Sequence, residues 1–129
     1  MTQHAIAKAT DITRDVTSDQ NWNIQDELMC QVFGFTLYGY IFGIGRIHYM
    51  IEVEEIHAIV VDQLVSLGIG RNYAVGLVDA AHREFTTKNN QSWQNQLIGV
   101  GHSHSIKEDK AVLIASIFSN TEALRKSCQ

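Results

Sequence analysis

The chain has 129 residues, of which 45% are apolar and 19% are charged, and its formal net charge is −4. This length suits one domain with a substantial core. The charged share lies below the level of about a quarter that is usual in soluble domains, which favours extra buried surface such as a subunit interface. The negative charge and the lack of a dense Lys/Arg cluster argue against nucleic-acid binding, which draws on concentrated positive charge.

The N-terminal residues 1–18 are mostly polar and are expected to form a flexible arm or a short helix, ahead of one helical domain over residues 19–129. They contain no apolar stretch of the kind a secretory signal peptide carries. Cys30 and Cys128 lie far apart in the chain. Two reduced thiols in a cytoplasmic protein are therefore the simplest interpretation.

The next element is expected to run from near Asn21 to Met50, with Ser18 and Asp19 as capping residues. Its middle, residues 33–45, is rich in aromatic residues and holds four glycines. Aromatic side chains suit strands, and each glycine weakens a helix by about 1 kcal/mol relative to alanine. The flanks have a helical pattern, however, and the segment has no Asn-Gly hairpin turn. We predict a helix, with strands in residues 33–45 as the alternative.

The same segment contains an uncharged run from Val32 to Gly45. This run is shorter than the roughly 20 residues that a membrane-spanning helix needs. We therefore expect a buried core element and no membrane association.

Helical periodicity and capping residues predict the remaining elements. One helix is expected from Glu52 to Leu67, stopped by Gly68 and Gly70, and Asn72 is expected to cap another from Tyr73 to Thr87. After a turn over residues 88–91, Ser92 is expected to cap a short helix from Trp93 to Ile98, broken by Gly99 and Gly101. The last helix is expected from Ile106 to Lys126, with Ser105 and Glu108 as a capping box. Together these elements predict an all-α, single-domain bundle of about four main helices, with an α+β fold as the alternative.

One possible interaction site is the pair Gly39-x-x-x-Gly43, whose bare backbone would let a second helix approach closely. The segment predicts either self-association as a homodimer, a groove for a ligand, or an ordinary crossing within the chain. The candidate interaction residues are Phe35, Tyr38, Gly39, Phe42 and Gly43.

Two acid–histidine pairs, Glu54-x-x-His57 and Asp79-x-x-His82, have the spacing of ligands in di-metal helical bundles. No obvious carboxylate ligands from two further helices accompany them, and local carboxylate–imidazole hydrogen bonds are the simpler interpretation. His102 and His104 are expected in an extended loop, where alternate side chains point the same way and could share a metal ion. A zinc site would need a third and usually a fourth ligand.

The chain has no nucleophile elbow, Walker-type loop, dinucleotide fingerprint or Cys-x-x-Cys motif. The leading interpretation is a small cytoplasmic binding or interaction protein, a homodimer without a cofactor or catalytic residues. The alternatives are a metal-dependent enzyme that uses the histidine-bearing helices and a protein that binds another protein or a small apolar ligand.

Overall fold

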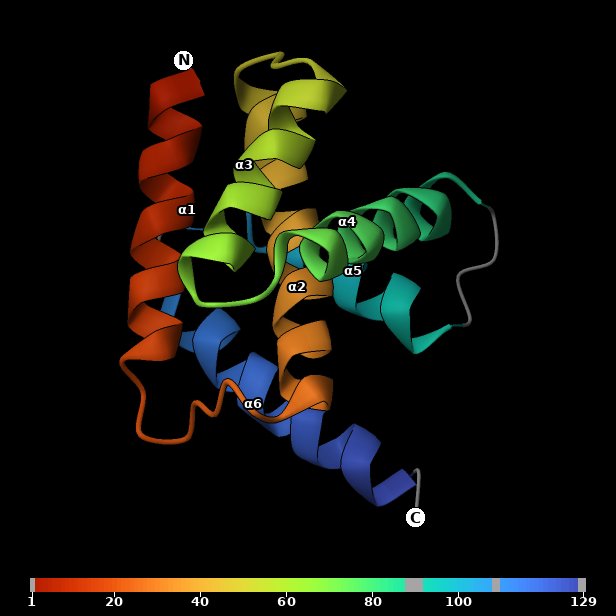
Figure 1. Ribbon diagram of the computed structural model, residues 1–129. Helices are drawn as coiled ribbons and strands as arrows, with labels where there is room; N and C mark the ends of the chain where they lie inside the picture. The colour runs from red at the N-terminus through yellow and green to blue at the C-terminus, as the bar shows by residue number, and fades with distance from the viewer. Residues whose placement is uncertain (1, 88–91, 108–109, 128–129) are drawn as a thin grey trace.

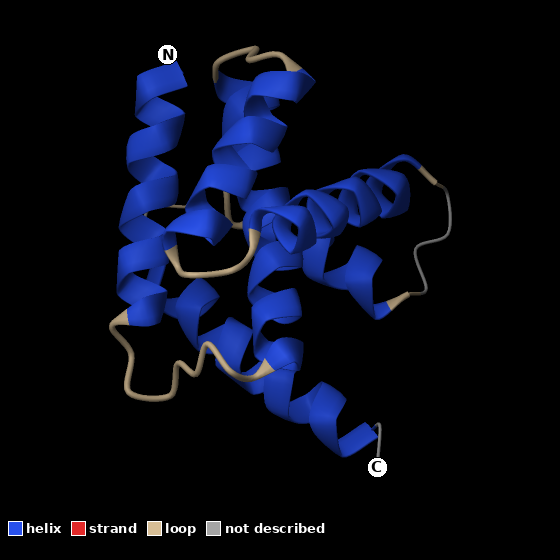
Figure 2. Cartoon of the chain, viewed as in Figure 1, coloured by secondary structure: helices blue, strands red, loops and turns tan. Residues whose placement is uncertain are grey.

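The computed structural model describes residues 2–87, 92–107 and 110–127, and Figures 1 and 2 show that the described chain is built from helices. The elements are α1 (Thr2–Thr17), α2 (Glu27–Phe42), the π-helical segment η1 (Gly43–His48), α3 (Val53–Ser66), α4 (Arg71–Thr86), α5 (Trp93–Ser103) and α6 (Lys110–Ser127). The predicted all-α class is confirmed. The expected count of about four main helices is too low, and no strand occurs in the described residues.

Helix α2 passes through the centre of the molecule, and the other helices pack around it (Figure 1). Almost all of α2 from Met29 to Ile41 is buried, so the helix is apolar on every side, as expected of a helix surrounded by protein. Its packing outweighs the helix-weakening effect of its glycines and aromatic residues. The twenty residues Glu27–Arg46 are long and apolar enough to cross a bilayer, but 83% of their most apolar 18-residue window is buried inside the fold, as in the core helix of a globular domain.

The start of α2 differs from the prediction. Residues 18–26 form turns, in which the Asp19 carboxylate accepts a hydrogen bond from the amide of Asn21. The N-cap is Asp26, whose carboxylate accepts from the amide of Met29. The expected start near Asn21, capped by Ser18 or Asp19, is therefore wrong, because Asp19 closes a local turn and leaves the capping role to Asp26.

Helices α2 and α5 cross with their backbones in contact. A Cβ atom at Gly39 of α2 would lie 1.9 Å from the carbonyl oxygen of Ile98, and one at Gly101 of α5 would lie 1.9 Å from the carbonyl oxygen of Thr36. Each helix thus requires a glycine where the other passes. The predicted end of α5 at Ile98 is wrong, because Gly101 serves this crossing and the helix continues to Ser103.

Helix α1 packs against the core, with Ala5, Ala9, Ile12 and Val16 buried along one side. Residues 2–17, expected as a flexible arm or a short helix, therefore form a packed helix. Helix α3 and the Ser92 cap of α5 match the predictions closely. Helix α4 begins two residues earlier than expected, after Gly70, so Asn72 lies inside its first turn and is not its cap.

The predicted start of the last helix is also wrong. Helix α6 begins at Lys110, and Ser105 belongs to the turn after α5, where its hydroxyl donates to the carbonyl oxygen of His102. Ser105 thus completes the end of α5 instead of capping α6. Glu108, the other half of the expected capping box, and the turn at residues 88–91 lie outside the described residues.

Candidate functional site

Two histidines and a tyrosine converge where α2, α3 and α4 meet. The hydroxyl oxygen of Tyr38 lies 3.0 Å from Nε2 of His57 and 3.3 Å from Nδ1 of His82. The two imidazole rings pack edge to face with their centroids 4.9 Å apart. Three successive α-helices thus supply one side chain each to a group that we call the Tyr38–His57–His82 cluster.

The hydrogen bonds of this cluster depend on where its protons sit. Tyr38 is fully buried in α2, and both histidines are half-buried on their helices. A phenol has one proton to donate and can also accept, and a neutral imidazole has one donor nitrogen and one acceptor nitrogen. The Tyr38 hydroxyl therefore satisfies both rings when it donates to one of them and accepts the N–H of the other.

Two phenylalanine side chains pack against Tyr38 at one side of the cluster. Phe42 stacks on Tyr38 at a centroid distance of 5.8 Å, and Phe85 of α4 lies 4.6 Å from Phe42 and 6.2 Å from Tyr38. Burial raises the pKa of Tyr38 to about 12. Burial also lowers the pKa of His57, and the neighbouring His82 lowers it further. Both shifts favour the uncharged form of the side chain.

The two acidic partners expected for these histidines lie at the edge of the cluster. Glu54 and Asp79 are exposed and act on His57 through their charge, which opposes the lowering of its pKa. The hydrogen-bond partner that the two imidazoles share is Tyr38. Among the described residues, no three His, Cys, Asp or Glu side chains are grouped so that they could hold a metal ion. The structure thus brings the two pairs together around a hydroxyl group.

The other two candidate histidines do not join the cluster directly. His102 lies in α5, with its ring 5.9 Å from that of Phe85, and His104 is the C-cap of α5, with Nδ1 2.9 Å from the carbonyl oxygen of Val100. The expected extended loop at these residues is wrong, because the helix continues through His102. The two rings therefore do not have the side-by-side placement that an extended chain would give them.

The predicted interaction residues lie mainly inside the fold. Tyr38 and Gly39 are buried, Phe42 is half-buried, and a Cβ atom at Gly43 would lie 2.3 Å from Oγ of Ser105. The Gly39-x-x-x-Gly43 face is thus occupied by α5 and the turn after it. This is the crossing within the chain that the sequence also allowed. Phe35, though 5% exposed, lines a groove at the surface.

This groove follows α4 on the side that meets α2 and α5. Its first part, of about 300 Å³, is lined by Gln31, Phe35, Tyr73, Gly76, Leu77, Ala80 and Gln94. A second part, of about 170 Å³, shares Phe35, Ala80 and Gln94 and continues to Arg83, Glu84 and Thr87. We call the two parts together the α4 groove. Its lining residues extend from Tyr73 to Thr87, so it follows most of the length of α4.

The α4 groove was not predicted from the sequence, although the sequence contains one signal for it. Gly76-x-x-x-Ala80 has the same small-residue spacing as Gly39-x-x-x-Gly43. In contrast to Gly39, Gly76 is exposed, and apart from the adjoining backbone of α4 no atom of the described residues lies within 4 Å of the position that its Cβ would take. The open face of α4 is therefore available to a partner, whereas the face of α2 is filled.

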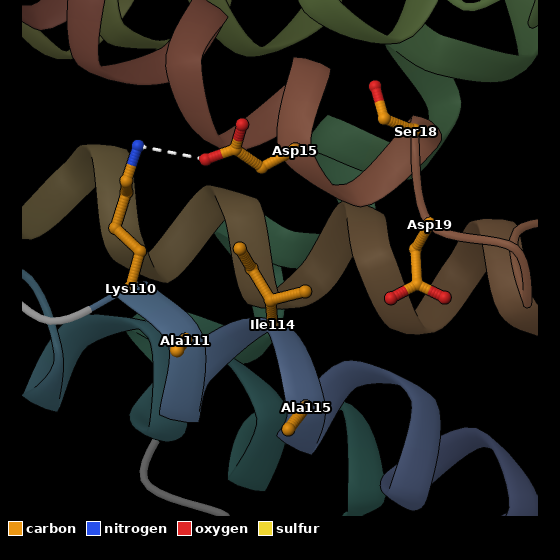
Figure 3. Close-up of a pocket in the computed structure, with 7 residues that line it drawn as sticks. All are labelled: Asp15, Ser18, Asp19, Lys110, Ala111, Ile114 and Ala115. Atoms are coloured by element: carbon orange, nitrogen blue, oxygen red, sulfur yellow. Dashed lines mark ion pairs between the residues drawn. The ribbon is translucent and has the colours of Figure 1, made fainter.

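A larger and shallower depression lies between α1 and α6 (Figure 3). Its lining includes the ion pair between Nζ of Lys110 and the carboxylate of Asp15, 3.0 Å apart. Asp19, at its other end, already accepts a hydrogen bond from the amide of Asn21. Its acidic groups are therefore engaged in holding α1, α6 and the first loop.

The comparisons with known proteins add no family to these observations. No family model, curated protein or solved structure matches the chain.

Proposed function

We propose that the protein is a small cytoplasmic interaction protein that acts as a homodimer, with α4 as the contact helix. The observation that carries this proposal is the open face at Gly76, where a Cβ atom would meet no neighbour within 4 Å. Beside it, Phe35 and Leu77 line the groove with apolar side chains that are 5% and 6% exposed. Burial of the apolar surface that remains exposed in the groove is favourable, at about 25 cal/mol for each Å² removed from water.

The shape of the groove favours a helix as the occupant. The groove extends along α4 as a stripe, with lining residues at the helical positions i, i+3, i+4, i+7 and i+11, which are Tyr73, Gly76, Leu77, Ala80 and Glu84. A second helix can lie along such a stripe. The small side chains at positions 76 and 80 let the two backbones come close, as small residues do at other close helix crossings.

A second copy of the chain is the partner that fits this face most simply. In a two-fold dimer, the same patch is used on both subunits. A crossing of α4 with the α4 helix of the second copy would therefore place the small residues of each helix against those of the other. The low charged fraction of the chain, 19%, agrees with extra surface that becomes buried in an assembly. The predicted homodimer is thus retained, with its contact moved from α2 to α4.

Light scattering coupled to size-exclusion chromatography tests this proposal with matched glycine variants. The variant Gly76→Gln places a long side chain in the open face of α4, and Gly99→Gln does the same on the exposed side of α5, where there is also open space. Both substitutions replace a helical glycine by a better helix former, so both variants should fold. We expect the mass of two chains for the wild type and Gly99→Gln, and a shift toward the mass of one chain for Gly76→Gln.

Two results would overturn the proposal. A wild-type mass of one chain at all accessible concentrations would exclude the homodimer. A dimer that survives Gly76→Gln as fully as Gly99→Gln would place the contact elsewhere on the surface. The same two variants also distinguish self-association from ligand binding. If the wild type is a monomer that binds a fluorescent apolar dye, and only Gly76→Gln lowers the affinity for the dye, the groove is a site for a small apolar ligand.

A further inference from the structure

The Tyr38–His57–His82 cluster joins the central helix to two helices that pack on it. Tyr38 lies on α2, His57 on α3 and His82 on α4, and the Tyr38 hydroxyl is the atom that connects the two rings. We propose that this cluster is a proton-sensitive clasp, which holds α3 and α4 on α2 at neutral pH and weakens when the histidines are protonated. This inference is independent of the proposed homodimer.

The cluster is sensitive to protons because protonation changes its numbers of hydrogen-bond donors and acceptors. In the neutral state, one imidazole nitrogen accepts the Tyr38 proton and the other ring donates its N–H to the same oxygen. Protonation of the accepting ring places a proton on the nitrogen that faced the hydroxyl. Both rings then donate toward one oxygen, and the hydroxyl proton loses its acceptor in the cluster. A second proton would leave two cationic rings with centroids 4.9 Å apart, which repel each other.

The groups that face the cluster differ in their effect on its charge. On α3, Glu54 favours a protonated His57, and on α4, Asp79 does the same while His82 opposes it. On α2, Tyr38 stays neutral until strongly alkaline pH. On α5, His102 reaches the cluster only through the ring of Phe85. Glu54 and Asp79 are exposed, so water screens their attraction for a protonated imidazole. Their negative charge is therefore too weak to offset the repulsion between two protonated rings.

Helix α1 also packs on α3, but at other residues. Thr2 donates to the carboxylate of Glu55, and Gln63 donates to the hydroxyl of Thr10. Residues 55 and 63 are well removed from residue 57 around the helix axis. The contacts of α1 therefore hold α3 from a different side and do not neutralise His57.

The direction of the pH effect follows from the lowered pKa of His57. Its value in the folded chain lies below the ordinary value of 6.5, so the unfolded chain binds the proton first as the pH falls. Stability therefore rises with pH through this interval. The contribution is fully present above pH 6.5 and is lost as the pH falls from there toward the folded-state pKa.

Equilibrium unfolding at about pH 7.5 and about pH 5.5, on either side of the ordinary histidine pKa, tests the clasp. The variants are His57→Gln and His82→Gln, because an amide keeps a hydrogen-bonding group but does not titrate. The matched control is His4→Gln, which removes an exposed imidazole outside the cluster. We expect the unfolding equilibrium constant of the wild type and of His4→Gln to rise several-fold on acidification, and that of the two cluster variants to rise clearly less.

A second measurement keeps the proposal falsifiable if a cluster variant does not fold. Imidazole resonances of the wild type, followed by NMR during a pH titration, should show that His57 is protonated only below its ordinary pKa of 6.5, and amides of α3 and α4 should lose hydrogen-exchange protection as His57 is protonated. Protonation of His57 at its ordinary pKa of 6.5, or unchanged protection of α3 and α4 once His57 is protonated, would overturn the clasp. So would cluster variants that keep the full pH dependence of the wild type.

Discussion

Gly39 of α2 and Gly101 of α5 each lie where the backbone of the other helix passes, so that a Cβ atom at either position would be 1.9 Å from a carbonyl oxygen. The relationship is reciprocal, because the contact of Gly39 is Ile98 on α5 and that of Gly101 is Thr36 on α2. This crossing sets the position of the central helix. It thereby places Tyr38, the residue before Gly39, toward the two histidines on the other side.

The first prediction concerns the stability of variants at the crossing of α2 and α5. Gly39→Ala and Gly101→Ala should each lower the free energy of unfolding by about 1–3 kcal/mol or more, since a side chain at either position forces the two backbones apart. Gly99→Ala is the control within α5, and it should instead stabilise the chain by up to about 1 kcal/mol, because alanine favours a helix and this position is open. Urea unfolding of the three variants measures whether each substitution raises or lowers the free energy of unfolding. Equal effects at positions 99 and 101 would contradict the described crossing.

Asp26 connects the first loop to the last helix and gives the second prediction. Its carboxylate caps α2 at the amide of Met29 and forms an ion pair with Arg125 of α6. Asp26→Ala removes both interactions, and loss of the cap alone should cost about 1 kcal/mol. Asp26→Asn keeps a capping oxygen and should retain most of that stability. Thermal unfolding of the two variants separates the cap from the ion pair, and an Asn variant as unstable as the Ala variant would show that the cap contributes little.

Tyr38 gives a prediction at alkaline pH. Burial raises its pKa to about 12, from an ordinary value of 10.0, so the unfolded chain releases this proton first as the pH rises. The stability contributed by the neutral phenol is therefore present below pH 10.0 and is lost as the pH rises toward about 12. Tyr38→Phe should show a flatter loss of stability in this range, measured by circular dichroism during alkaline titration. An unchanged alkaline transition in Tyr38→Phe would contradict the buried position of this hydroxyl.

Much of the fold was predictable because local signals determine it. The apolar period of α3, its stop at Gly68 and the Ser92 cap of α5 are short-range features, and the structure contains all three. The errors arise where a local signal was ambiguous. Gly101 has the sequence signature of a helix break, yet it is a contact point for α2, and Ser105 matches a capping box but bonds backward to His102. The roles of Gly101 and Ser105 depend on tertiary packing, which the periodicity of the sequence does not reveal.

The candidate site was predictable only in its parts. The spacings Glu54-x-x-His57 and Asp79-x-x-His82 single out the two histidines, and the aromatic segment singles out Tyr38. Their convergence on one hydroxyl depends on how α3 and α4 pack against α2. The two glycine motifs show the same limit, since one is filled by α5 and the other is open to solvent. Sequence spacing shows which residues share a face, and the tertiary fold decides whether that face is covered.

Disulfide cross-linking at position 76 tests the proposed dimer contact most directly. The experiment uses Gly76→Cys in a chain whose natural Cys30 and Cys128 are replaced by alanine and serine, with Gly99→Cys as the matched control. Under mild oxidation, we predict rapid formation of a covalent dimer for Gly76→Cys and slow, concentration-driven cross-linking for Gly99→Cys, because two-fold contact of α4 with its copy brings the two Gly76 positions together. Equal cross-linking rates for the two variants would contradict the assignment of α4 as the contact helix.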